Sequence, residues 1–202
     1  MSAEPIDRSS TAIIGRPNIS KERRLQPFTA VDLERMGSDS WFEIVQGQLY
    51  ETWPLGFDTA VAMSKLNRSL SNHVRKQRLG LVVVGAGFVM ERDPDTVTAP
   101  KGAFISSDRL SDDNAPDGYF PGEPDLAIET ASPLDTLVDL ERKRNVYMRL
   151  PVRLLWWIYS ERQTASVHVP GKPDRHLSDS DFLDGESIVP GFSIRIAELF
   201  DY

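Results

Sequence analysis

The sequence predicts an α/β fold in which helices flank a mixed central sheet, and three features of the chain lead to this prediction. The stretch from Pro124 to Ala131 is apolar on both of its faces, as is typical of a strand inside a sheet. The segments from about 58 to 79 and from about 135 to 150 repeat apolar residues at helical spacing. Short apolar runs bounded by Gly, Pro and Asp lie around these helices, as expected of further strands.

The N-terminal part of the chain predicts a short helix and a hairpin. Thr29 and Asp32 have the spacing of a capping box, which opens a helix that runs to about Met36. The residues from Trp41 to Glu51 alternate between apolar and polar and turn at Gln46-Gly47, a pattern typical of a β-hairpin. We expect these elements to form an N-terminal extension of the fold.

A long helix and two strands come next. Apolar residues recur at helical spacing from about Asp58 to Leu79, and Gly80 is a natural residue to end this helix. Strands are predicted from Leu81 to Met90 and from Val97 to Ser106. The residues from Ser107 to Glu123 are poor in apolar side chains and rich in aspartate, which favours a solvated surface loop.

The strand from Pro124 to Ala131 carries a carboxylate that a purely structural strand would not need. Because side chains alternate along a strand, Asp125 and Glu129 share one face and Ile128 lies on the other. An ionised carboxylate inside a sheet is costly unless a cation, a metal ion or a cluster of donors meets it. Glu129 therefore needs a positive partner.

The following helix can supply that partner. Asp135 or Thr136 can cap it, and Pro151 ends it after Leu150. Lys143 falls inside its apolar arc, and Arg144, near the other side of that arc, could serve as a second cation. Two alternatives stay open for Lys143: its ammonium reaches the rim of the protein, or it forms a purely structural ion pair with Glu129.

The last third of the chain predicts strands and a short terminal helix. Residues 152–160 and 164–169 form a hairpin in which Trp156 and Trp157 point to opposite sides, where packing is a better explanation than base stacking. Strands over 183–189 and 192–196 flank a Pro190-Gly191 turn, and a last helix follows.

Length and composition indicate one domain without sulfur chemistry. With 202 residues the chain can form a full core, and we expect a single domain over residues 25–202 after a polar, disordered tail over 1–24. The absence of cysteine excludes disulfides and thiolate metal sites, and the three histidines show no ligand spacing. Any metal ion would therefore be bound by oxygen ligands.

Charge and hydropathy bear on compartment and partners. No apolar run approaches a membrane span and no secretory signal is visible, so we expect a cytoplasmic protein. A net charge of −7 does not suggest strong sequence-independent attachment to nucleic acid. Such binding would depend on local basic groups, either Arg75 and Lys76 or Arg142 and Arg144, although solvated helix charges are the ordinary interpretation of the first pair.

Several motifs occur in order and together resemble one family. They are PDLAIETASP, a helix with Lys143 four residues before Tyr147, VRLLWWIYS and VPGFSIRIAELF. From Phe28 to Phe200 the chain resembles the Uma-two family of bacterial restriction endonucleases, part of the PD-(D/E)XK nuclease superfamily. The resemblance implies a restriction-endonuclease-like fold, hydrolysis of phosphodiesters with Mg²⁺ or Mn²⁺, and DNA as a partner. Sheet-edge pairing and the aromatic strands also suggest a homodimer.

The resemblance assigns roles to particular residues. It makes Glu129 a metal ligand, Lys143 the lysine that positions water, and Glu43 of the hairpin an accessory acid. It also places a metal-binding aspartate directly after a proline in the stretch 97–106, where this chain has Lys101 after Pro100. A negative ligand is thus replaced by a positive charge.

Two hypotheses follow. Either the protein is a metal-dependent endonuclease, with Asp95, Asp108 or Glu43 in place of the missing aspartate, or it is a nuclease-derived module that binds nucleic acid or protein without cleavage. In the second hypothesis the Lys101 ammonium takes the position of the metal and bridges to Glu129.

Overall fold

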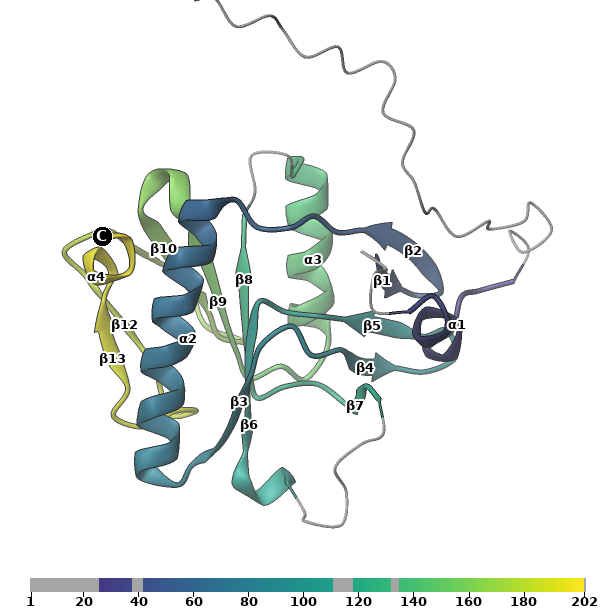
Figure 1. Cartoon of the computed structure of the whole chain (residues 1–202), viewed down its shortest axis with the longest axis horizontal. Coiled ribbons are helices and arrows are strands. Elements are labelled where there is room, and N and C mark those ends of the chain that lie inside the picture. Colours follow the sequence, from purple (N-terminus) through teal and green to yellow (C-terminus); the bar gives the residue numbers. More distant parts are fainter. Residues whose placement is uncertain (1–25, 38–41, 111–117, 132–134, 202) are drawn as a thin grey trace, which may run out of the picture.

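The computed structural model describes residues 26–37, 42–110, 118–131 and 135–201 (Figure 1). The predicted tail over 1–24 and Trp41 lie outside the described residues, as does part of the aspartate-rich loop. None of the helices in the described ranges is long and apolar enough to cross a membrane.

A six-stranded mixed sheet lies at the centre of the fold, as predicted. Its strand order is β11-β10-β9-β8-β6-β3, with β8 and β9 parallel and the other neighbours antiparallel. The predicted strand that carries Glu129 is β8, and every residue of it is buried. The bounds are β3 Gly80–Val83, β6 Gly102–Ser106, β8 Leu126–Thr130, β9 Leu154–Tyr159, β10 Thr164–His168 and β11 Arg175–Leu177.

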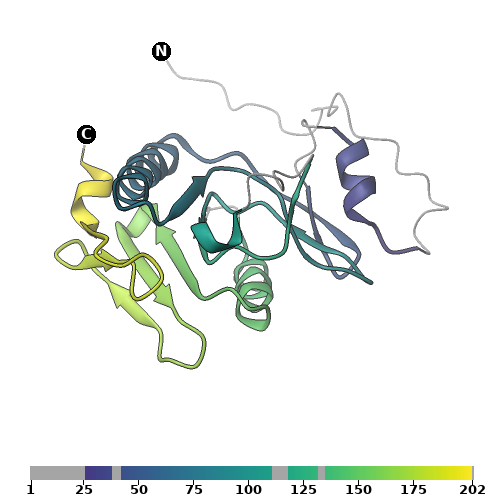
Figure 2. The same ribbon diagram turned by 90° about the horizontal axis from the view of Figure 1, so that it is seen from below.

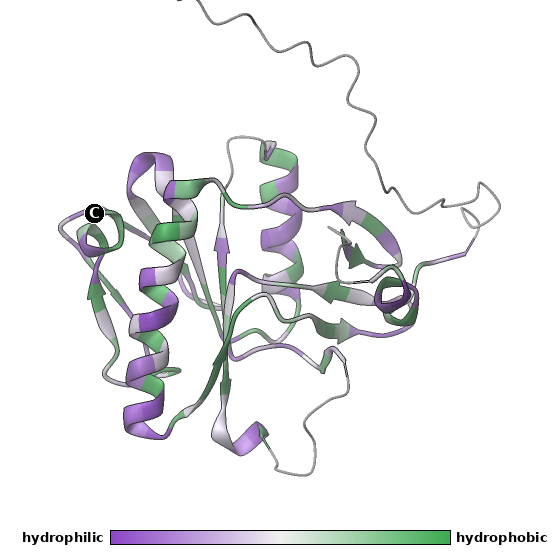
Figure 3. Cartoon of the chain, viewed as in Figure 1, coloured by the Kyte–Doolittle hydropathy of each residue, from purple (hydrophilic) through white to green (hydrophobic). Residues whose placement is uncertain are grey.

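The two long helices cover opposite faces of this sheet, as Figure 2 shows. Helix α2 (Phe57–Gln77) packs on the face that contains Ile128 and Trp156, and α3 (Leu137–Arg149) packs on the face that contains Ala127 and Trp157. Hydrophobic residues recur among hydrophilic ones along both helices (Figure 3). At helical spacing such residues form an apolar stripe, which packs on the sheet. The predicted division of the two tryptophans between the faces is confirmed.

A five-stranded sheet of order β2-β1-β5-β4-β7 lies beside the central one. Its strands are β1 Phe42–Val45, β2 Gln48–Glu51, β4 Phe88–Glu91, β5 Thr96–Thr98 and β7 Phe120–Pro121. The predicted hairpin is β1–β2, and its turn residues Gln46 and Gly47 both have positive φ, as this turn requires. The predicted capping box at Thr29 opens α1 (Ala30–Arg35).

Two predicted strands are wrong as single elements. The segment 81–90 divides into β3 and β4, and 97–106 divides into β5 and β6, with the two halves in different sheets. Gly85 has a φ of +64° and a Cβ at Gly87 would collide with Tyr119, so the chain bends away between β3 and β4. Pro100 has no N–H for a ladder and separates β5 from β6. The second bend brings Lys101 to the start of β6.

The ends of other elements differ slightly from the prediction. Helix α2 ends at Arg78, whose backbone is left-handed, and not at Gly80. The predicted strand over 183–189 is confined to β12 (Phe182–Asp184), which pairs with β13 (Ser193–Arg195) before α4 (Ile196–Phe200). Two 3₁₀ turns, η3 (Ser107–Arg109) and η4 (Ser160–Arg162), complete the fold.

Candidate active site

Glu129 lies near the end of β8 and faces α3. Its side chain is completely buried. Burial raises the pKa of its carboxyl, although Lys143, Lys101 and the Tyr147 hydroxyl each favour the charged form. Its Oε2 atom accepts no hydrogen bond within the described part of the chain. Glu129 is thus a buried acid whose charge depends on nearby cations.

Lys143 provides the predicted partner. Its Nζ lies 3.5 Å from Oε2 of Glu129 and 3.2 Å from Oε2 of Glu43. Burial alone would lower the pKa of Lys143, but the two carboxylates outweigh it and raise the pKa above its ordinary value. The predicted meeting of Glu129 and Lys143 is therefore confirmed, whereas their chemical roles stay proposals.

Glu43 reaches the same point from the other sheet. It lies on β1, is buried, and accepts a hydrogen bond of 3.0 Å from the backbone N–H of Ala99. Ala99 lies just after β5, the strand that pairs with β1. Thus the division of the 97–106 segment positions both Glu43 and Lys101 at the cluster.

Tyr147 also belongs to the cluster, although the sequence predicted no chemical role for it and placed it only on the apolar arc of helix α3. Its hydroxyl donates a hydrogen bond of 2.7 Å to Oε1 of Glu129. Burial, followed by the charges of Glu129 and Glu43, raises the pKa of this hydroxyl well above its usual value. The available signal was its position four residues after Lys143, which places both side chains on one helix face.

Lys101 lies beside the cluster without joining it through an ion pair. Lys101 directly precedes β6, whose first residue, Gly102, pairs with Ile128, the neighbour of Glu129 on β8. The Lys101 N–H donates to Ile128 O at 2.9 Å, and Asn67 donates to the Lys101 carbonyl at 3.0 Å. Its ammonium lowers the pKa of Glu129 yet forms no hydrogen bond or ion pair with any described residue. The predicted bridge to Glu129 is therefore wrong.

The other carboxylates considered as replacement ligands do not reach the cluster. Asp125 accepts hydrogen bonds from Ser106 and pairs with Arg109 and Arg153, and these partners outweigh burial and lower the pKa of its carboxyl. Asp95 accepts a hydrogen bond from the backbone of α1 and pairs with a neighbouring arginine, and Asp108 is exposed on η3. Only Glu43 of the three proposed substitutes lies in the site.

The donor set does not fit a divalent ion. Across the described ranges, no three carboxylate or imidazole side chains gather as metal ligands. The cluster instead combines Glu43 and Glu129 with two ammonium groups, those of Lys143 and Lys101. Mg²⁺ and Mn²⁺ prefer several oxygen ligands, and an ammonium group beside the two carboxylates repels them.

The four basic residues predicted to bind nucleic acid do not form one surface. Arg142 pairs with Asp139 at 2.7 Å and lies over the ring of Tyr50 at 3.8 Å. Arg144 pairs with Asp174 at 2.7 Å. Arg75 and Lys76 are exposed in the last turn of α2, roughly 12 Å along the helix from Asn67, which donates to the Lys101 carbonyl, and they do not line the cleft described below.

Lys101, Arg142 and Lys143 line a cleft of about 230 Å³ together with an equal number of carboxylates, those of Glu51, Asp135 and Asp139. The connection over 52–56, which runs from β2 to α2, forms one wall, and Thr130 and the first turns of α3 form the others. Figure 1 shows this connection passing across the top of β8 and α3.

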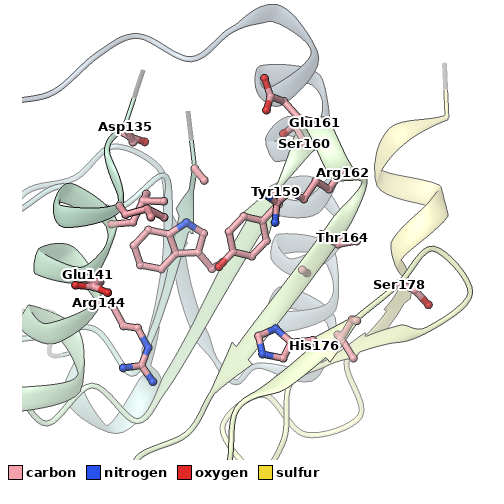
Figure 4. Close-up of a pocket in the computed structure, with 16 residues that line it drawn as sticks. Asp135, Glu141, Arg144, Tyr159, Ser160, Glu161, Arg162, Thr164, His176 and Ser178 are labelled. Atoms are coloured by element: carbon pink, nitrogen blue, oxygen red, sulfur yellow. The ribbon is translucent and has the colours of Figure 1, made fainter. Parts of the chain in front are cut away.

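A larger cavity of about 810 Å³ lies between α3 and strands β9–β11, as Figure 4 shows. Its lining includes the carboxylates of Asp135, Glu141 and Glu161 against the guanidinium groups of Arg144 and Arg162. Since acids outnumber arginines and Arg144 is already paired with Asp174, this cavity is poorly suited to a polyanion. We therefore place the candidate site at the smaller cleft despite its size.

A second polar group resembles the arrangement of a serine hydrolase. His168 contacts Ser166 Oγ at 2.8 Å through Nε2 and Asp174 at 2.8 Å through Nδ1. Ser166 is completely buried, so its hydroxyl cannot meet a substrate in this conformation. We interpret this group as a structural network that anchors Arg144 of α3.

Comparisons with known proteins agree with the fold. Similarity to a solved structure described as a putative nuclease belonging to DUF820 from Anabaena variabilis has a TM-score of 0.70 at 17% sequence identity, and covers 86% of this chain and 98% of that one. No curated protein matches the chain. A family described as "Uma2: Putative restriction endonuclease" matches residues 28–197, so the chain belongs to the Uma2 family and has its nuclease-like fold.

Proposed function

We propose that this protein binds nucleic acid in the cleft beside Glu129 and does not hydrolyse it with a bound divalent ion. The observation that carries the proposal is Lys101, a cation close enough to Glu129 to favour its charged form, in the stretch where the resemblance places a metal-binding aspartate. Family membership and the nuclease-like fold support a nucleic acid as the ligand.

Electrostatics supports the loss of metal binding. A pair of unit charges about 4 Å apart interacts by about 4 kcal/mol at an effective dielectric constant near 20. Replacing an aspartate by Lys101 removes one attraction of this kind for a divalent ion and adds a repulsion. In metal-dependent nucleases, the bound ion polarises the phosphate and supplies an activated water. This chain's residues offer that ion two carboxylates, and Lys143 lies between them.

The same change favours a phosphate. An ammonium group donates up to three hydrogen bonds and attracts phosphate oxygens. The Lys143 ammonium is held by Glu43 and Glu129, whereas the Lys101 ammonium has no partner among the described residues. Lys101 is therefore the cation that we expect to contact the phosphate directly, with Lys143 keeping the buried acids neutralised.

Restoring the aspartate tests the proposal. The native chain, Lys101→Asp and the double variant Lys101→Asp/Glu129→Gln are incubated with DNA and RNA in Mg²⁺ or Mn²⁺, and ion binding is measured by calorimetry. We expect the native chain to bind nucleic acid but neither cleave it nor take up an ion at micromolar concentration. Lys101→Asp should gain ion binding and cleavage that the second substitution removes.

A metal-dependent endonuclease is the second candidate. The unsatisfied Oε2 of Glu129 beside the carboxylate of Glu43 favours it, since both oxygens could turn towards an ion. Cleavage by the native chain that requires Mg²⁺ and disappears in Glu129→Gln would establish this candidate and refute our proposal.

A further inference from the structure

We infer that the ligand of this cleft is a single-stranded nucleic acid, one base of which stacks on the indole of Trp53. The inference rests on the proposed function, because it names the class of nucleic acid that the same cleft binds. It depends on three observations: the exposure of Trp53, its position beside an unpaired ammonium, and the dimensions of the cleft.

Trp53 is exposed to solvent, although a large aromatic side chain stabilises a protein when it is buried. It lies on the 52–56 connection and leaves 48% of its surface accessible, whereas Trp156 and Trp157 are 0% and 2% exposed. Four residues later Phe57 is 78% exposed at the first position of α2. Two large aromatic side chains are therefore presented to solvent within five residues of the chain, and Trp53 is the one that lines the cleft.

The charge beside Trp53 indicates a polyanion as the occupant. Trp53 and Lys101 line the same cleft, and the Lys101 ammonium forms no ion pair with a described residue. Proteins that bind single strands combine aromatic side chains, on which bases stack, with cations that contact the backbone. An indole beside an ammonium that forms no ion pair provides both parts of that combination.

The cleft accepts a part of a longer ligand. Its volume of about 230 Å³ is below the roughly 300 to 1,000 Å³ typical of pockets for whole drug-sized molecules. A polymer that places one nucleotide in the cleft and continues over the surface fits this size. The bases of a duplex are already stacked on their neighbours, so only an unpaired or flipped base can lie against the indole.

Titrations with matched oligonucleotides test the inference on the full chain. Fluorescein-labelled DNA of about 12 nucleotides is compared as a single strand, as its duplex and as a strand with abasic sites in place of bases. Anisotropy gives the affinity of the native chain and of Trp53→Ala, Trp53→Phe and Lys101→Ala. Phe182→Ala is the matched control, since Phe182 is 56% exposed on β12 and lies outside the cleft.

We expect the native chain to prefer the single strand over both the duplex and the abasic strand. Loss of one stacked base by alanine substitution corresponds to roughly a five- to 150-fold loss of affinity, so Trp53→Ala should lose at least about fivefold on the single strand only. Trp53→Phe should retain most of the affinity, and Lys101→Ala should weaken binding to all three oligonucleotides. Phe182→Ala should match the native chain.

Other results overturn the inference. Equal binding to single strand, duplex and abasic strand, unchanged in Trp53→Ala, would refute stacking and leave the proposed function in place. Absence of binding to any oligonucleotide would refute both. If Trp53→Ala changes only the sedimentation behaviour of the protein, the exposed indole belongs to a contact between protein copies and the inference is wrong.

Discussion

At the scale of single residues, the site is a cluster of opposite charges and not a set of metal ligands. Glu43 and Glu129 contribute two negative charges at the cluster, and Lys143 lies within 3.5 Å of both. Lys101 adds a second positive charge that reaches Glu129 electrostatically without an ion pair. The summed charge of these four side chains is zero only while both lysines are present. Removal of one lysine leaves a buried carboxylate without a compensating charge and destabilises the folded state.

Lys143→Met tests this balance through its dependence on pH. Removing one partner of a buried ion pair typically costs about 3 to 5 kcal/mol, because the remaining charges are uncompensated. Burial already raises the pKa of Glu129, and loss of Lys143 raises it further. Because the folded variant then holds a proton more tightly than the unfolded chain, its stability is greatest below the unfolded pKa of about 4.3 and declines as pH rises through the folded pKa.

The measurement is urea unfolding of the native chain, Lys143→Met and Lys143→Arg at about pH 5 and pH 8. The methionine variant should lose most stability at pH 8 and regain part of it at pH 5, whereas the arginine variant should stay close to the native chain at both. A loss for Lys143→Met that is the same at both pH values would mean that Glu129 is not charged in the folded protein.

At the scale of elements, α3 controls the geometry of the site because it carries both Lys143 and Tyr147. Its first turn is fixed by a capping box: the Thr136 hydroxyl accepts the N–H of Asp139, and the Asp139 carboxylate accepts the N–H of Thr136 at 3.2 Å. Its outer side is held by Arg144, which pairs with Asp174 on the way to β11. Both attachments lie outside the cleft and still determine where the ammonium lies.

Thr136→Ala should therefore weaken the protein through α3. Loss of a side-chain cap costs about 0.5 to 2 kcal/mol, and the orphaned N–H groups of the first turn allow it to fray. We expect a lower urea midpoint with an unchanged slope, and native stability in Thr136→Ser, which keeps the hydroxyl. If Thr136→Ala has the midpoint of the native chain, the capping box does not contribute to the stability of the folded state.

The elements also explain which features the sequence predicts and which it does not. The meeting of Glu129 with Lys143 follows from two local rules, alternation along β8 and spacing along α3. Pro100 is a local sign that the 97–106 segment divides, but the sheet that each half joins is not local, because β5 pairs with β1 and β4 whereas β6 pairs with β3 and β8. For the same reason, the contact of Glu43 with Ala99 N–H could not be derived from spacing, and its place in the site came from the family resemblance.

At the scale of the whole molecule, the overall charge opposes the proposed ligand. The chain carries 30 acidic and 23 basic residues, for a net charge of −7, so a polyanion is repelled at long range. Arg142 and Arg144 are paired with acids, and Arg75 and Lys76 do not line the cleft. Binding must therefore depend on few phosphate contacts, and a homodimer, which stays a prediction, would not change the sign of the charge.

This charge distribution predicts a weak dependence of binding on salt. Each phosphate neutralised on a single strand contributes about −0.7 to the slope of log K against log salt concentration. With Lys101, and at most Lys143, in contact with phosphate, the slope for single-stranded DNA should lie between about −0.7 and −1.4, measured from about 50 to 200 mM salt. Lys101→Ala should reduce its magnitude by about 0.7, whereas Arg75→Ala should leave it unchanged. A slope steeper than about −3, reduced by Arg75→Ala, would instead place the nucleic acid along the exposed end of α2 and away from the cleft.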